Sequence, residues 1–192
     1  MKLYLALHPP LSSQALQHHI LAHHLNTHPD AIHIDRSKKP VCTSHSVEFS
    51  VSHTRHAFAM AIHYESVGID MEAFDRSIPW AIFNRHRTPA IDAFNAPWPP
   101  ANLSTNHQKV WHWTRWEAHC KLTGTGLLFP ILPQTSSHVQ SFFWQDLCLS
   151  VASQGPVDAP ECLRLTVGQN VDSGSDKPLK WSVDTDAISP LH

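Results

Sequence analysis

Residues 47–72, VEFSVSHTRHAFAMAIHYESVGIDME, carry the pattern that decides the fold. The stretch contains three apolar runs typical of β-strands, at 47–52, 57–64 and 67–72. A short turn with histidine and arginine separates the first two runs, which favours a β-hairpin. Three consecutive strands are therefore expected here, and the first two are expected to pair.

Helices are expected on both sides of these strands. Residues 12–26 have an amphipathic pattern that Ser12 or Ser13 can cap, and residues 107–123 have the strongest helical pattern, between Asn106 as N-cap and Gly124. Strands that adjoin helices in this order predict an α+β fold. Further runs indicate strands at 1–7, 32–34, 141–152, 161–168 and 179–184, a loosely helical segment at 78–94 and a loop at 96–106.

The amino-acid composition excludes several classes of protein. The chain has 192 residues, 42% of them hydrophobic, and a formal net charge of −2, which excludes a strongly basic nucleic-acid-binding chain. No apolar run approaches the ~20 residues of a membrane span. The N-terminal apolar patch meets Pro9 and Pro10 too early for a secretory signal, so a cytoplasmic protein is expected. Four cysteines without a C-x-x-C pair are expected to be reduced thiols.

The third expected strand carries two acids, in the motif GIDME at 68–72. Asp70 and Glu72 are two residues apart, so both carboxylates point to the same face of a strand. Two like charges at this distance repel unless water or a cation separates them. An oxygen-rich pair of this kind suits Mg²⁺, with phosphate and water as further ligands. The alternative is a solvent-facing strand with ordinary acids.

The second expected helix carries a polar stripe. Trp113, Glu117 and Lys121 follow one another at intervals of four residues, which places them on one side of the helix. Glu117 is a candidate third carboxylate, and Lys121 is a candidate phosphate-binding cation. The alternative is a surface ion pair between Glu117 and Lys121, which contributes only a few tenths of a kcal/mol.

Two more elements complete a pattern of ordered motifs. The run FSVSHT at 49–54 ends in His53, and Lys39-Pro40 precedes it in an expected loop. In chain order the motifs are K-P, F-S-V-S-H, G-I-D-x-E and W-x-x-x-E-x-x-x-K-x-x-G-x-G. This order, over about residues 30–130, resembles the 4′-phosphopantetheinyl transferases of the broad-specificity, surfactin-synthetase-activating type.

The resemblance implies an enzyme and its partners. Members of this family are Mg²⁺-dependent and transfer the phosphopantetheine arm of coenzyme A to a serine of an acyl or peptidyl carrier protein, releasing adenosine 3′,5′-bisphosphate. It also implies a monomer of two similar α/β lobes with the active site between them. The lobes would cover residues 1–66, on the coenzyme A side, and 67–192, with the metal and catalytic motifs. Neither nucleic acid nor a membrane is an expected partner.

The family roles can be carried over to matching residues. Asp70 and Glu72 match the acids that hold Mg²⁺ on the pyrophosphate of coenzyme A. Glu117 matches the helix acid that completes the metal site and acts as base on the carrier serine. Lys121 matches the lysine that contacts the phosphates.

Two further matches concern the nucleotide. His53 matches the histidine at the 3′-phosphate of coenzyme A, and Lys39 matches the lysine of the G-K-P element. The stretch after the third strand interleaves aromatic and basic side chains and is the expected docking surface for the carrier protein. Its residues are Phe74, Arg76, Trp80, Phe83, Arg85, His86 and Arg87.

The chain also departs from the family pattern. Trp116 stands where the family has lysine, Thr125 where it often has a basic residue, and Lys38 where it has glycine before Lys-Pro. An acid that the family has after the metal strand is missing unless Asp92 substitutes. The loss of cations keeps a second hypothesis open, in which a degenerate member binds coenzyme A or carrier protein with little turnover.

Histidine is unusually abundant, with 17 residues in the chain. His19 and His23, and also His24 and His28, have the four-residue spacing that can chelate Zn²⁺ on a helix. No cysteine stands nearby in the sequence to complete such a site. A solvated helix face is therefore preferred, and a His-rich metal-binding protein is the third hypothesis.

Overall fold

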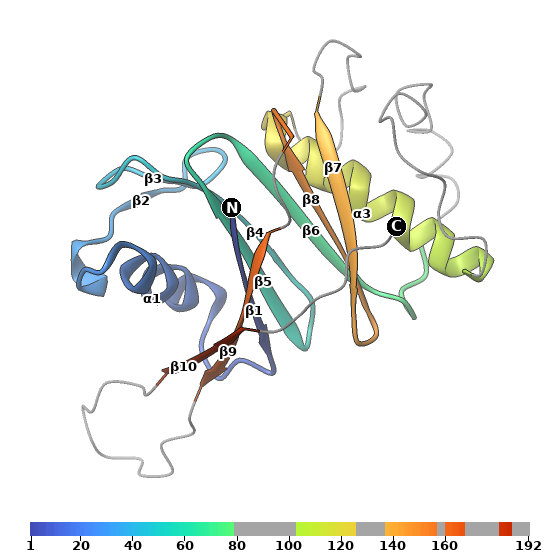
Figure 1. Ribbon diagram of the computed structural model, residues 1–192, viewed down its shortest axis with the longest axis horizontal. Coiled ribbons are helices and arrows are strands. Elements are labelled where there is room, and N and C mark those ends of the chain that lie inside the picture. The colour runs from blue at the N-terminus through green and yellow to red at the C-terminus, as the bar shows by residue number, and fades with distance from the viewer. Residues whose placement is uncertain (79–102, 126–136, 157–159, 168–180, 186–192) are drawn as a thin grey trace.

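The computed structural model describes residues 1–78, 103–125, 137–156, 160–167 and 181–185. These residues form two long helices, a short 3₁₀ helix and ten strands in three sheets (Figure 1). The expected α+β class is confirmed. Neither long helix is of a kind that could span a membrane, among the described residues.

The first sheet has the strand order β10-β9-β1-β5-β4. The expected hairpin is confirmed, since β4 and β5 pair antiparallel with Ser50 opposite Ala61. Strand β1 pairs antiparallel with β5 and parallel with β9. The strands are β1 (Lys2–Leu7), β4 (Glu48–His53), β5 (Ala57–His63), β9 (Glu161–Val167) and β10 (Trp181–Thr185).

Helix α1 (Ser13–Leu25) covers one face of the first sheet. The Ser12 hydroxyl accepts a hydrogen bond from the Ala15 N–H at 3.2 Å, as expected of an N-cap. Leu16 and Ile20 of the helix are buried in one cluster with Tyr4 and Phe58 of the sheet. A 3₁₀ helix (Pro29–Ala31) and a small sheet of β2 (Ile34–Asp35) and β3 (Val41–Cys42) connect α1 to β4.

The second sheet has the order β6-β8-β7 and is antiparallel throughout. Its strands are β6 (Val67–Ala73), β7 (His138–Trp144) and β8 (Leu147–Ser153). The single strand expected at 141–152 is wrong, because a turn at Gln145 and Asp146 divides this stretch into the β7–β8 hairpin. Both turn residues are polar and exposed, and Gln145 has a φ of 57°.

Helix α3 (Thr105–Thr123) packs on the outer face of the second sheet (Figure 1). Its N-cap is Ser104, whose hydroxyl accepts from the His107 N–H at 3.3 Å. The expected cap Asn106 is wrong, because its side-chain amide donates instead to the Phe74 carbonyl at 2.8 Å. Gly124 ends the helix with a φ of 69°, as expected.

Successive side chains of a strand point to opposite faces of its sheet, and the molecule has four layers in the order helix, sheet, sheet, helix. In β1, Tyr4 joins the cluster under α1, whereas Leu3 and Leu5 join the cluster between the two sheets. In β6, Val67, Ile69 and Met71 fill the same space between the sheets. The intervening residues of β6 therefore face α3, and these include both acids of the GIDME motif.

Gly68 allows α3 to lie directly on β6. A Cβ atom at this position would be 2.0 Å from the Ala118 carbonyl oxygen and 2.5 Å from the Leu122 nitrogen. Both atoms belong to the helix backbone, so no side chain can move aside to make room. The absence of a side chain at position 68 thus sets the close approach of strand and helix.

Two similar lobes are not evident in the part of the chain that the structure describes. The first sheet has five strands and the second has three, and β9 and β10 return from the C-terminal part to extend the first sheet beside β1. The segment 78–94, apart from Ile78, lies outside the described residues, as do most residues of the expected docking surface. All four cysteines are buried.

Candidate active site

Three acids from two elements meet at the contact between β6 and α3. Asp70 and Glu72 project from β6, and Glu117 projects from the facing helix. One carboxylate oxygen of each lies within 4.8 Å of the other two. Asp70 is 2% exposed and Glu72 is 8% exposed. The sequence prediction that these acids converge is confirmed.

Asp70 is the most enclosed of the three acids. Its Oδ1 atom accepts a hydrogen bond from the Ser52 hydroxyl at 2.9 Å and forms an ion pair with Lys121 Nζ at 2.7 Å. Its Oδ2 atom is buried and has no hydrogen-bond partner. An ionised oxygen buried without a partner is costly, and a cation relieves that cost.

The three carboxylates fit a hard divalent cation. Carboxylate oxygen is the ligand type that Mg²⁺ prefers, and Mg²⁺ commonly takes a few carboxylates and leaves other positions to water and phosphate. The orphaned Oδ2 of Asp70 and the close approach of three acids are the observations that support this fit. Asp70, Glu72 and Glu117 are the residues that would hold the ion.

The pKa of the Glu117 side chain is strongly raised. Its pKa is raised to about 7: burial and the charge of the Asp70 carboxylate raise it, as does a hydrogen bond with Asp70, while Lys121 and Arg76 act in the opposite direction. Glu117 is therefore poised to exchange a proton near neutral pH.

The alternative reading of Lys121, a surface ion pair with Glu117, is wrong. The ion pair of Lys121 is with Asp70, and its ammonium group also donates to the Val51 carbonyl at 3.3 Å. The lysine side chain extends from α3 to β4 and β6 rather than along its own helix. Lys121 therefore links α3 to both sheets at the acidic cluster.

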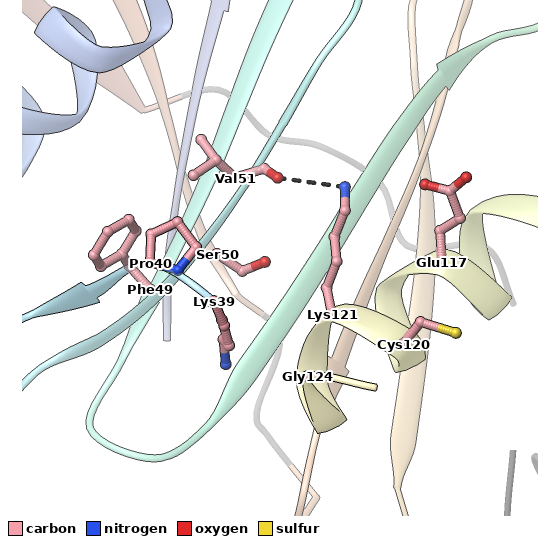
Figure 2. A pocket seen from close by; sticks show the side chains of 9 residues that line it. All are labelled: Lys39, Pro40, Phe49, Ser50, Val51, Glu117, Cys120, Lys121 and Gly124. Atoms are coloured by element: carbon pink, nitrogen blue, oxygen red, sulfur yellow. Dashed lines mark hydrogen bonds between the residues drawn. The ribbon is translucent and has the colours of Figure 1, made fainter. Parts of the chain in front are cut away.

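A cavity of about 390 Å³ opens beside these groups (Figure 2). Lys39 and Pro40 line it from the loop before β3, and Glu117 and Lys121 line it from α3. Lys39 donates to the Val67 carbonyl at 3.1 Å and lies 3.6 Å from Glu48. The structure thus brings Lys39, which is 82 positions before Lys121 in the chain, to the same cavity.

His53 lies at the exposed end of β4. It follows Ser52, which holds Asp70, but it is not among the residues that line the cavity of Figure 2. The structure therefore places five of the six expected residues at the acidic cluster or its cavity. His53 is one position along the strand from the residue that contacts the cluster.

Two serines of β4 are site residues that the sequence did not identify. The Ser50 hydroxyl accepts from the Ile69 N–H at 3.1 Å, and the Ser52 hydroxyl accepts from the Met71 N–H at 3.1 Å. These contacts connect the edge strand of the first sheet to β6. The signal was the alternation in FSVSH, which places both serines on one face of the strand.

Arg76 is a further residue of the site that sequence reasoning assigned elsewhere. Its guanidinium Nη1 forms an ion pair with Glu72 Oε1, and it lies 5.7 Å from the centre of the Trp113 ring. Arg76 follows Glu72 by four residues, but a turn rather than a helix separates the two. Helical periodicity therefore could not predict their contact.

The departures at positions 116 and 125 have different structural consequences. Trp116 is buried and packs edge-on against Trp113 at 5.1 Å in the core between α3 and the second sheet. A lysine there would have to enter this core. Thr125 is exposed, and its hydroxyl lies 2.8 Å from that of Thr123.

The histidines of α1 form separate contacts. The Tyr4 hydroxyl is 3.0 Å from His24 Nδ1 in α1. His28 lies past the end of α1, at the N-cap of the 3₁₀ helix, and its Nδ1 is 3.3 Å from Asp30. Among the described residues, Asp70, Glu72 and Glu117 are the one group of three or more potential ligands close enough to hold an ion.

The chain was compared with known proteins. No protein-family model matches it, and no curated protein matches its sequence.

Proposed function

We propose that the chain is a Mg²⁺-dependent 4′-phosphopantetheinyl transferase that moves the phosphopantetheine arm of coenzyme A to a serine of an acyl or peptidyl carrier protein. The observation that carries the proposal is the meeting of Asp70, Glu72 and Glu117 beside a cavity that Lys39 and Lys121 also line. The ordered motifs that resemble the transferases supply each of these five residues.

The cluster has the charge pattern that pyrophosphate chemistry needs. Mg²⁺ held by the three acids would neutralise charge on the phosphate oxygens of coenzyme A. Lys121 and Lys39 both line the cavity, and ammonium groups of this kind can bind further phosphate oxygens. Positive groups fixed before the substrate arrives stabilise the charge that develops on the leaving phosphate.

Glu117 is the residue proposed to accept the proton of the carrier serine. A carboxylate beside the metal can take the proton of a hydroxyl group as it attacks. In the metal-free protein the pKa of Glu117 is raised to about 7, and a cation held by Glu117 would lower it. Glu117 lines the cavity from α3 (Figure 2). Asp70, whose Oδ1 is bound by Ser52 and Lys121, is less available for this role.

The finer architecture is part of the same proposal. Residues 1–66 and 67–192 would form two related lobes, and the cavity would lie at their contact. The close packing of β4 against β6 supports this placement, because β4 precedes the boundary and β6 follows it. A cytoplasmic monomer remains the expected form of the protein.

The proposal is tested by intact mass. The full chain is incubated with coenzyme A, Mg²⁺ and an apo carrier protein, and the carrier is weighed by mass spectrometry. The expected result is a gain of one phosphopantetheine group, which requires both coenzyme A and Mg²⁺. A carrier of unchanged mass, across acyl and peptidyl carriers, would contradict transferase activity.

A second candidate, a binding protein with little turnover, is favoured by one observation. Trp116, buried in the core, stands where the family has a lysine, so the chain lacks that cation. Binding of coenzyme A in a titration, together with an unchanged carrier mass, would support this candidate over the enzyme.

A further inference from the structure

Arg76 places a permanent positive charge against the acidic cluster. Its guanidinium binds the Glu72 carboxylate directly. One of the three acids that would hold a cation is therefore already paired with an arginine.

The arginine is held in this place by its surroundings. Its guanidinium lies over the Trp113 ring, 5.7 Å from the ring centre. Its backbone is fixed as well, because the Arg76 N–H donates to the Ala73 carbonyl at 3.0 Å and the Asn106 amide donates to the Arg76 carbonyl at 3.3 Å. The contact with Glu72 is thus supported by both the turn and the start of α3.

A divalent cation and Arg76 compete for the same carboxylate. Glu72 belongs to the group of three acids whose oxygens lie within 4.8 Å of one another, and the guanidinium already occupies its Oε1. A cation at the cluster would also be repelled by the nearby guanidinium. Arg76 has an exposed side chain fraction of 44%, so it can turn toward solvent when it leaves Glu72.

We propose that Arg76 is a counter-ion latch on the metal site. It holds Glu72 in place while no cation is bound, and it releases Glu72 when a divalent cation enters. Arg76 acts through Glu72 and is therefore a positioning residue. The inference rests on the metal site of the proposed function, but it does not require that the chain transfer phosphopantetheine.

The test is a titration of the metal-free protein with Mn²⁺, in which free Mn²⁺ is followed by electron paramagnetic resonance. Arg76→Gln removes the charge, and we expect it to bind Mn²⁺ about tenfold more tightly than the original chain. Arg76→Lys keeps the charge and should bind close to the original chain. Arg164→Gln, an exposed arginine on β9 of the other sheet, is the matched control and should leave Mn²⁺ affinity unchanged.

Thermal unfolding supplies a second readout. Without metal, Arg76→Gln leaves Glu72 beside two other acids with no counter-ion, so its melting temperature should fall. Saturating Mn²⁺ should restore more of the melting temperature in this variant than in the control.

Each outcome decides the proposal. Tighter binding in Arg76→Gln that is lost when Asp70→Asn is added supports the latch at this cluster. Equal or weaker binding in Arg76→Gln, or no saturable Mn²⁺ binding in any variant, overturns it. The mass assay is independent: a latch that fails while the carrier still gains phosphopantetheine leaves the proposed function standing.

Discussion

The acidic cluster and the histidine-rich helix α1 differ in how they gather side chains that can bind a cation. The acids come from β6 and α3, and their oxygens converge within 4.8 Å. The histidines of α1 lie along a single helix and make separate contacts, such as that of His24 with Tyr4. Abundance of a ligand type is therefore a weaker sign of a site than convergence from two elements.

The environment of the two regions differs as well. Asp70 is nearly fully buried, and one of its oxygens has no partner. His23 and His28 are exposed to solvent, where a neutral or charged imidazole is readily hydrated. A buried, incompletely paired carboxylate has a reason to bind a cation that an exposed histidine lacks.

The largest effect is expected from Asp70→Asn. The amide keeps the size of the side chain but removes the charge, so both metal binding and transfer should fall by at least about 100-fold. Asp75→Asn, an exposed acid five positions along the chain, is the matched control. Transfer assays with Mg²⁺ measure the difference, and near-normal activity in Asp70→Asn would mean that the cluster is not the metal site.

Gly68→Ala should disrupt the close packing of α3 on β6, which brings the three acids together. The added Cβ would meet the backbone of α3, so we expect a loss of about 3 kcal/mol or more in the free energy of unfolding. Gly155→Ala is the control, because a Cβ there meets nothing within 4 Å. Denaturant unfolding measures both variants; equal stability would show that strand and helix can separate at little cost.

Cation binding should depend on pH through Glu117. Because its pKa is raised to about 7, Mn²⁺ affinity should rise about tenfold per pH unit below that value and level off above it. In the metal-free protein the sign is opposite. The raised pKa stabilises the fold below the unfolded-state value near 4.5, and this contribution is lost as the pH rises through about 7.

Titrations and unfolding curves at several pH values test both signs. Glu117→Gln should abolish the pH dependence of Mn²⁺ affinity between about 6 and 8. A dependence that persists in this variant would assign the titration to another group, such as a histidine.

The smallest effect is expected from the histidines of α1. Changing His18, His19, His23 and His24 together to glutamine should leave transfer within about threefold at pH 8, because none of them belongs to the acidic cluster or lines its cavity. The same variant should keep the Mn²⁺ affinity of the original chain. Activity that is lost and then restored by zinc would contradict the contrast between the two regions.

Much of this site could be predicted because its residues follow regular periods. Asp70 and Glu72 share a face through the two-residue period of a strand, and Glu117 and Lys121 share one through the four-residue period of a helix. Neither period predicts which strand the helix packs on. That packing depends on the absence of a Cβ atom at Gly68, which lets the strand approach the helix backbone at Ala118.

The features that were missed depend on contacts between distant segments or on turns. Ser52 reaches Asp70 across two sheets, and Arg76 reaches Glu72 around a turn. The hairpin at Gln145 was hidden because strand-like residues continue on both sides of two polar positions. Asn106 was a reasonable cap by residue type, but its amide is used to hold the turn after β6.

The most direct test of the central claim is a crystal structure of the protein soaked with Mn²⁺, with anomalous scattering used to locate the ion. The account predicts a peak between the carboxylates of Asp70, Glu72 and Glu117, with Arg76 turned away from Glu72. A peak at the histidines of α1 and none at the three acids would contradict it.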